Sequence, residues 1–238
     1  MKRLKQFFAG WNWFEKTFFV AVLILPAVFS VVFESSVVGW LSTTLYLLWA
    51  FLCARGKSYA HIIGIPAIFI YAYVSYTANY YGEVLITFFV MLPLIVISLF
   101  AWLGNKRADS RQGSYIVVSI PNKKEMAIAA ASQFIMGVGY YFLLRAFNTD
   151  FLIVSTISIM TSVFATYLTM RRNQHTFVAY LVNDVVLIIL WAYVVVGGQM
   201  EFIPILLMPI MLLANDIYGI FNWARLRKSQ VERKGAQT

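Results

Sequence analysis

The chain has 238 residues, of which 61% are apolar and only 12% are charged, and its mean hydropathy is +0.74. Soluble domains have about 45–50% apolar and about 25% charged residues, so this composition excludes a soluble enzyme, a disordered chain and a disulfide scaffold. The net charge of +9 does not indicate a nucleic-acid partner, because the basic residues form small groups between apolar runs. A single cysteine, Cys53, excludes an intrachain disulfide. The composition predicts a protein whose solvent is the lipid bilayer.

Eight apolar runs are long enough to cross a bilayer, which takes about 20 helical residues. In chain order they cover residues 17–33, 37–54, 59–80, 84–103, 126–147, 151–170, 177–196 and 202–224. The runs do not alternate between apolar and polar residues, which argues against a transmembrane β-barrel. No small-residue cleavage site follows the first run, so we expect it to be retained. The sequence thus predicts an all-α integral membrane protein with eight transmembrane helices.

The basic residues predict the orientation of these helices. With eight spans both termini lie on one side, and all 19 Lys and Arg residues except Arg145 fall on that side. Because Lys and Arg mark the cytoplasmic side, we expect both termini in the cytoplasm. The opposite loops are short and carry Glu34, Glu83, Asp150 and Glu201. One long loop, residues 104–125, is expected to be cytoplasmic, and residues 115–120 within it are compatible with either a short strand or an interfacial segment.

Two parts of the chain share features that suggest an internal repeat. A Phe-x-Trp motif ends the fourth span at Trp102 and the eighth at Trp223, and a basic turn begins at Arg55 and at Arg171. We expect two parallel three-helix repeats and a linker helix, as in transporters that bind substrate at the repeat interface. The predicted segments are 1–36 (an extra membrane helix), 37–103 (first repeat), 104–125 (loop), 126–147 (linker), 151–224 (second repeat) and 225–238 (a basic tail). The alternative is that any two three-helix units look alike at this level.

Two carboxylates fall well inside predicted spans. Asp184 and Asp216 each follow an asparagine, Asn183 or Asn215, at a depth of roughly 10–12 Å from the cytoplasmic edge. Charged groups inside a membrane are costly and usually functional. We expect the two aspartates to line one central cavity and at least one of them to contact a substrate or ion. The alternative is a polar network that serves helix packing.

Aromatic residues follow helical spacing in two spans. One face of the third span carries Phe69, Tyr73, Tyr76 and Tyr80, and one face of the seventh carries Phe177, Tyr180, Asp184 and Trp191. A stripe of this kind is able to hold a flat ligand ring by stacking. The candidate substrate-binding residues are therefore Tyr73, Tyr76, Phe177, Tyr180 and Trp191, together with the two Asn-Asp pairs, and the alternative for the stripes is ordinary packing.

The sequence has no phosphate loop, nucleophile elbow or zinc motif. Its two histidines, His61 and His175, do not suffice for a metal site. We therefore expect no catalytic residue, no metal and no cofactor. A membrane enzyme or receptor remains an alternative class.

Several short motifs are similar to those of a known family. They are Gly56-Lys57, Tyr71-Ala72-Tyr73-Val74-Ser75-Tyr76 with Tyr81-Gly82-Glu83, Leu92-Pro93 with Trp102, Met170-Arg171-Arg172, and Tyr218-Gly219 with Asn222-Trp223. Over nearly its full length the chain resembles the PnuC family of bacterial nicotinamide riboside transporters. The resemblance implies a core of three plus one plus three helices, as in SWEET sugar transporters, preceded here by an extra helix. It also implies a homotrimer in the bacterial inner membrane, facilitated diffusion of a nucleoside-like vitamin precursor, and trapping by a cytoplasmic kinase.

The chain departs from the family pattern within the expected pocket. Phe177 and Tyr180 stand where two tryptophans are usual, His175 replaces a glutamate, Ile95 a glutamine and Asp184 an asparagine. Nicotinamide riboside is the default ligand, since its cationic pyridinium suits Asp184 or Asp216. Deoxynucleosides and thiamine are the alternatives, and a proton-coupled transporter would use the same aspartates as proton carriers.

Overall fold

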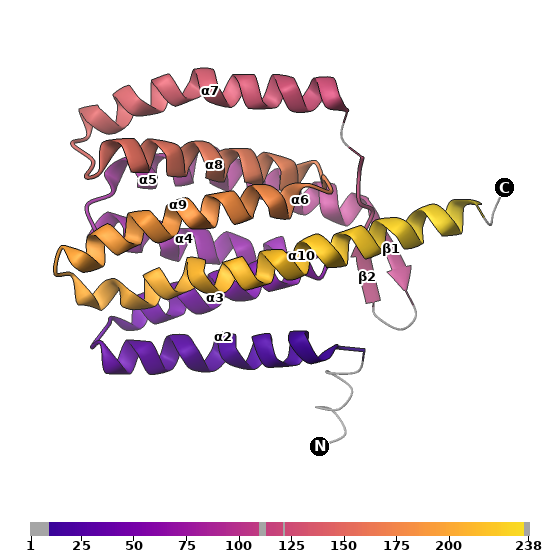
Figure 1. Ribbon diagram of the computed structural model, residues 1–238, viewed down its shortest axis with the longest axis horizontal. Helices are drawn as coiled ribbons and strands as arrows, with labels where there is room; N and C mark the ends of the chain where they lie inside the picture. Colours follow the sequence, from indigo (N-terminus) through magenta and orange to yellow (C-terminus); the bar gives the residue numbers. More distant parts are fainter. Residues whose placement is uncertain (1–9, 110–112, 121, 236–238) are drawn as a thin grey trace.

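The structure is a computed structural model that describes residues 10–109, 113–120 and 122–235. The predicted orientation also uses Lys2, Arg3, Lys5 and Arg111, which lie outside these residues. The described helices are α2 (Trp13–Val32), α3 (Val37–Ala54), α4 (His61–Thr77), α5 (Tyr81–Ile86), the π-helix η1 (Thr87–Met91), α6 (Leu92–Gly104), α7 (Lys123–Ala146), α8 (Leu152–Met170), α9 (Thr176–Val196), the short η2 (Met200–Phe202) and α10 (Ile203–Gly235). They pack side by side in one bundle (Figure 1).

The eight predicted spans are confirmed as helices. Among the described residues seven helical segments are long and apolar enough to cross a membrane, and α4 is a shorter apolar helix of 17 residues. Helices α5, η1 and α6 join into one 24-residue segment. The wider turn at η1 has a local cause, since Pro93 lacks an N–H and its ring would clash with the carbonyl of Phe89 in a regular α-helix.

Two helix ends differ from the ends of the expected spans. The third span was expected to reach residue 80, but α4 ends at Thr77 because Asn79 adopts a left-handed conformation with φ of 62°. The last span was expected to end near residue 224 and to be followed by a basic tail, and α10 continues as one helix through most of that tail to Gly235. Residues 225–234 contain no proline or glycine and are rich in Arg, Lys, Leu, Gln and Glu, which favour helix.

The start of α2, the end of α10 and a small β-hairpin lie at the same end of the bundle, here called the hairpin end (Figure 1). Strands β1 (Lys106–Asp109) and β2 (Gly113–Ile116) pair antiparallel, with Lys106 opposite Ile116. Of residues 115–120, for which a short strand was one of two alternatives, Tyr115 and Ile116 belong to β2. The chain passes along the bundle an even number of times, counting α5, η1 and α6 as one segment. The start of α2 and the end of α10 therefore lie at the same end of the bundle.

The two three-helix units, α3–α4–α5/α6 and α8–α9–α10, make matching contacts. The last helix of each packs on the first helix of the other, α10 on α3 and α6 on α8. The Trp102 indole donates a hydrogen bond to the Thr169 carbonyl (2.9 Å), and the Trp223 indole donates to the Cys53 carbonyl (3.1 Å). Thr169 precedes Arg171 by two residues, just as Cys53 precedes Arg55. These paired contacts support the predicted parallel repeat.

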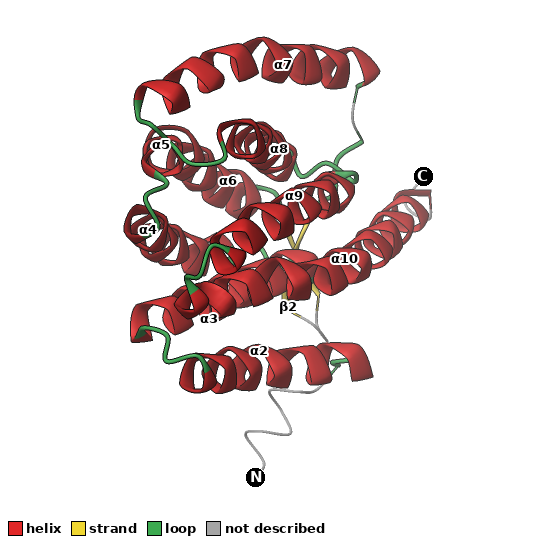
Figure 2. Ribbon diagram, turned by 60° about the vertical axis from the view of Figure 1, so that its left-hand side comes forward, coloured by secondary structure: helices red, strands yellow, loops and turns green. Residues whose placement is uncertain are grey.

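Helices α2 and α7 lie at opposite edges of the bundle, with the other helices between them (Figure 2). Helix α2 is joined to the core by a buried ion pair between Glu15 and Arg55, with Nε and Oε1 2.9 Å apart. The Tyr218 hydroxyl of α10 donates to the same carboxylate at 2.6 Å. Asn12 caps the helix and completes a capping box with Glu15. Glu15 therefore connects α2 to both α3 and α10.

The segment after β2 connects the two units at the hairpin end. The Ile116 N–H donates to the Gly56 carbonyl (3.0 Å) and the Ser119 N–H donates to the Arg172 carbonyl (2.9 Å). Gly56 and Arg172 follow Arg55 and Arg171 directly, and both have positive φ. Residues 116–119 thus bind the equivalent turns of the two units.

Candidate functional site

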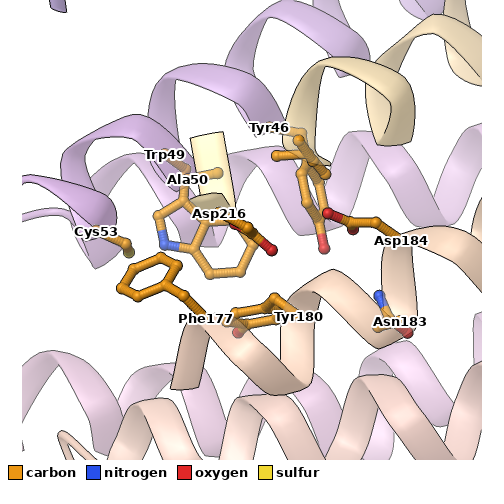
Figure 3. Close-up of a pocket in the computed structure, with 10 residues that line it drawn as sticks. Tyr46, Trp49, Ala50, Cys53, Phe177, Tyr180, Asn183, Asp184 and Asp216 are labelled. Atoms are coloured by element: carbon orange, nitrogen blue, oxygen red, sulfur yellow. The ribbon is translucent and has the colours of Figure 1, made fainter. Parts of the chain in front are cut away.

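A small cavity of about 30 Å³ lies between α3, α9 and α10 (Figure 3). It is called here the aspartate cavity, and its lining residues are Tyr46, Trp49, Ala50, Cys53, Phe177, Tyr180, Asn183, Asp184, Leu212 and Asp216. This space exceeds what one water molecule needs but is smaller than the roughly 300–1,000 Å³ of ligand pockets. A nucleoside-sized ligand would therefore require the surrounding helices or side chains to move apart.

Helical spacing explains why these side chains meet. On α3 the lining residues recur at intervals of three, one and three from Tyr46 to Cys53, and on α9 they recur at three, three and one from Phe177 to Asp184. Leu212 and Asp216 are four residues apart on α10. Each helix therefore presents one face to the cavity.

Asp184 and Asp216 are the most polar groups of the aspartate cavity. Their exposed fractions are 1% and 2%, so neither faces lipid. The Asn215 amide donates to Oδ1 of Asp216 at 3.3 Å, whereas Oδ2 of each aspartate has no hydrogen-bond partner among the described residues. Figure 3 shows the two carboxyl groups turned toward the same space, near Tyr46. The expected location of both aspartates on one cavity is confirmed.

Three further predicted residues line the same cavity. Phe177 packs so closely on α10 that a Cβ at Gly219 would lie 2.5 Å from its ring, so a residue without a side chain is needed there. The Tyr180 hydroxyl accepts a hydrogen bond from Thr169 at 3.0 Å. The Asn183 side-chain oxygen accepts from Thr161 (2.9 Å) and Ser162 (2.7 Å). These contacts fix the orientation of α9 relative to α8 and α10.

A second cavity of about 40 Å³, called here the Glu83 cavity, includes residues of α5 and η1 in its lining. Helix α5 lies toward the end of the bundle away from the hairpin (Figure 1). Its lining residues are Tyr46, Ile68, Tyr71, Glu83, Ile86, Thr87, Met91, Ile159, Ser162 and Leu187. Tyr46 lines both cavities. Among the described residues that line either cavity there is no lysine or arginine.

Four predicted site residues lie elsewhere. Tyr73 and Tyr76 are 57% and 56% exposed on the outside of α4, so their expected place in the pocket is wrong. Helical spacing defines a face but not its direction, and the inward face of α4 carries Gly64, Ile68 and Tyr71 instead. Trp191 is buried but packs against Tyr71, Tyr80 and Phe202. Asn215 contacts Asp216 without lining either cavity.

Sequence reasoning missed three residues that line the cavities. Tyr46 and Trp49 have the same three-residue spacing on α3 as Phe177 and Tyr180 on α9, and this spacing was a usable signal. Glu83 was expected in an outer loop, yet it lies in the first turn of α5 and is only 6% exposed. Its position directly after Tyr80, Tyr81 and Gly82 gave no sign that the chain turns inward there.

Comparisons with known proteins agree with the helical fold described above. A family model described as "Nicotinamide mononucleotide transporter" matches residues 36–225. The chain belongs to this family. Its members are transporters and not enzymes, and the matched region begins just before α3, so the family model leaves α2 outside.

Similar proteins carry related names. The chain is 25% identical to a nicotinamide riboside transporter PnuC of Neisseria mucosa, over 94% of this chain and 86% of that protein. It is also 25% identical to a nicotinamide riboside transporter PnuC of Haemophilus influenzae, over 95% and 96% of the two chains. The fold matches a solved structure titled "Crystal structure of the Vitamin B3 transporter PnuC", with a TM-score of 0.84, 23% identity, and coverage of 95% and 97%. The resemblance to the PnuC family is thereby confirmed.

Proposed function

We propose that the protein carries a cationic, nucleoside-like vitamin precursor across the membrane by facilitated diffusion, with nicotinamide riboside as the default ligand. Support comes from the family match and from the names of the two bacterial relatives. The ligand would occupy a widened aspartate cavity, with its ring against Phe177 and Tyr180. Aromatic faces attract cations as well as flat rings.

One observation carries this proposal. Asp184 and Asp216 are buried together, and no lysine or arginine is present among the described residues that line their cavity. A buried carboxylate without a partner is costly, so it either holds a proton or meets a cation. The pyridinium of nicotinamide riboside supplies a permanent positive charge, which balances one carboxylate.

Three alternatives use the same cavity. Thiamine is also cationic, whereas deoxynucleosides are neutral and would not need two carboxylates. A proton-coupled transporter is the third alternative, because carboxylates inside a membrane commonly serve as proton relays. In that mechanism Asp184 or Asp216 would carry the proton.

A binding panel on purified protein separates these ligands. We expect nicotinamide riboside to bind more tightly than its neutral dihydro form, nicotinamide mononucleotide, riboflavin or deoxynucleosides. Asp184→Asn and Asp216→Asn should each reduce this preference for the cation, while Asp150→Asn, a change at an exposed position, should leave it intact. Equal affinity for the cation and its dihydro form would contradict the proposal. Tighter binding of thiamine than of nicotinamide riboside would identify thiamine as the ligand instead.

The cellular setting is part of the same proposal. We place the protein in the bacterial inner membrane with both termini in the cytoplasm, as the distribution of basic residues predicts. A cytoplasmic kinase would trap the ligand by phosphorylation, since the added charge prevents return. A homotrimer is the assembly that the family resemblance implies.

A further inference from the structure

We propose that the Glu83 cavity is a second binding station for the same cationic ligand, on the path between the aspartate cavity and the end of the bundle away from the hairpin. This inference rests on the proposed function and names a residue, Glu83, that contacts the ligand during passage. Tyr46 would be the side chain that the ligand must pass between the two stations.

Glu83 has the burial of an interior residue. Its two carboxylate oxygens accept hydrogen bonds from different helices, Oε1 from the Ser158 hydroxyl at 3.1 Å and Oε2 from the Tyr71 hydroxyl at 3.4 Å. Both donors are neutral, and no lysine or arginine is present among the described residues that line the cavity. The hydrogen bonds orient the carboxylate but do not balance its charge.

Packing alone does not account for a carboxylate at this position. A glutamine has the same shape and its side-chain oxygen accepts hydrogen bonds from hydroxyl groups, without the cost of burying a charge. The contacts to Ser158 and Tyr71 therefore explain the orientation of the Glu83 side chain but not its negative charge. We assign that charge to the binding of a mobile cation. The same argument applies to Asp184 and Asp216, so the two cavities share one chemistry.

Tyr46 connects the two cavities. It lines both of them and lies within electrostatic range of Glu83, Asp184 and Asp216. The walls are also linked by the hydrogen bond from Ser162, which lines the Glu83 cavity, to Asn183, which lines the aspartate cavity. A ligand that leaves one carboxylate site thus reaches the next by displacing a single aromatic ring.

The test compares uptake of nicotinamide riboside with uptake of its neutral dihydro form in proteoliposomes. In Glu83→Gln we expect the KM for the cation to rise by about tenfold, and the KM for the neutral form to change less than about twofold. Glu201→Gln removes a negative charge from an exposed position in η2, between α9 and α10, and should change neither KM.

Two results would overturn the second station. They are an equal rise of both KM values in Glu83→Gln and an unchanged KM for the cation. If Glu83→Gln does not fold, Glu83→Asp replaces it, because this variant keeps the charge but shortens the side chain by one methylene group. Glu83→Asp should still raise the KM for the cation more than the KM for the neutral form. An equal rise of both KM values in Glu83→Asp would also overturn the inference.

The wild-type measurement separates this inference from the proposed function. Absence of nicotinamide riboside uptake by the wild-type protein contradicts the proposed function itself. Normal wild-type uptake that depends on Asp184 but shows no charge-selective effect at Glu83 contradicts only the second station.

Discussion

At the scale of single residues, the aspartate cavity combines aromatic rings from α3 and α9 with two buried carboxylates, and its described lining contains no lysine or arginine. Phe177 is 1% exposed and packs against Trp223 as well as Gly219, so its ring is held firmly at the cavity wall. Tyr180 is held through its hydroxyl by Thr169. These contacts restrict the rotamers of both rings, which lowers the entropic cost of binding once the cavity has widened to admit a ligand.

Phe177→Ala and Tyr180→Ala should therefore each weaken binding of nicotinamide riboside. Loss of one aromatic partner costs about 1 kcal/mol, or somewhat under tenfold in affinity. Isothermal titration of the purified variants measures this effect. Tyr73→Ala is the matched control, because Tyr73 lies on the exposed face of α4 and its removal should leave affinity unchanged. Normal binding by both cavity variants would mean that these rings serve packing only.

A second residue-scale prediction concerns the buried ion pair of α2. Glu15 pairs with Arg55 and accepts from Tyr218, and the Arg55 guanidinium also lies 4.1 Å from the ring centre of Trp11. Glu15→Ala leaves Arg55 buried without its counter-ion, so we expect the free energy of unfolding to fall by about 3–5 kcal/mol. Thermal melting in detergent reports the change.

The comparison variant is Glu125→Ala. Glu125 forms an ion pair with Arg171 in which the Arg171 side chain is 53% exposed and the Glu125 side chain 34% exposed, in contrast to the buried Glu15–Arg55 pair. Exposed pairs contribute little because solvent screens them, so its melting temperature should stay close to that of the wild type. Similar losses in the two variants would contradict the assigned role of Glu15.

At the scale of elements, residues 116–119 are held by α10 as well as by the two turns. The Gln230 side chain accepts from the Val118 N–H at 3.1 Å and donates to the Ile116 carbonyl at 3.0 Å. The helical extension of α10 beyond the membrane core therefore has a structural role. It positions the segment that binds the equivalent turns of both three-helix units.

Gln230→Ala should release this segment. Two hydrogen bonds are lost, each contributing about 0.5–1.5 kcal/mol, so amide hydrogen exchange in residues 115–120 should become faster. Mass spectrometry of the exchanged peptides measures it. Glu232→Ala changes an exposed residue one half-turn further along α10 and should leave exchange unchanged. Unchanged protection in Gln230→Ala would show that the turns alone hold the segment.

The elements differ in how far they were predictable from sequence. Span α3 was predicted at its observed residues, 37–54, because a bilayer requires a continuous apolar run and the run is bounded by Ser36 and Arg55. The direction of each helical face was not predictable in the same way. In α4 both faces are apolar or aromatic, so the spacing did not indicate that Tyr71 is buried and Tyr73 exposed. The Asp184–Asp216 pair was predictable because charges are rare inside spans, whereas Glu83 at a span end resembled an ordinary loop residue.

At the scale of the whole molecule, the two three-helix units enclose the cavities between them. The aspartate cavity takes its lining from α3 of the first unit and from α9 and α10 of the second, and the Glu83 cavity likewise draws on both units. Relative motion of the units would therefore widen or narrow both cavities. This arrangement suits alternating access, in which one unit moves against the other around a central site.

The proposed function requires that transport proceed without an energy source. A cationic ligand responds to voltage at about 2.3 kcal/mol per 100 mV for each charge, so equilibration must be tested at zero membrane potential. Equal potassium on both sides with valinomycin provides that condition for purified protein in liposomes. Uptake of nicotinamide riboside is then followed with and without an imposed proton or sodium gradient.

Facilitated diffusion predicts that the internal ligand concentration rises until it equals the external concentration under every gradient, and that the ligand leaves again on dilution. Accumulation above the external concentration under a proton or sodium gradient would contradict the claim. If Asp184→Asn or Asp216→Asn then abolished proton-driven accumulation while equilibration persisted, that aspartate would be the proton carrier of a coupled transporter.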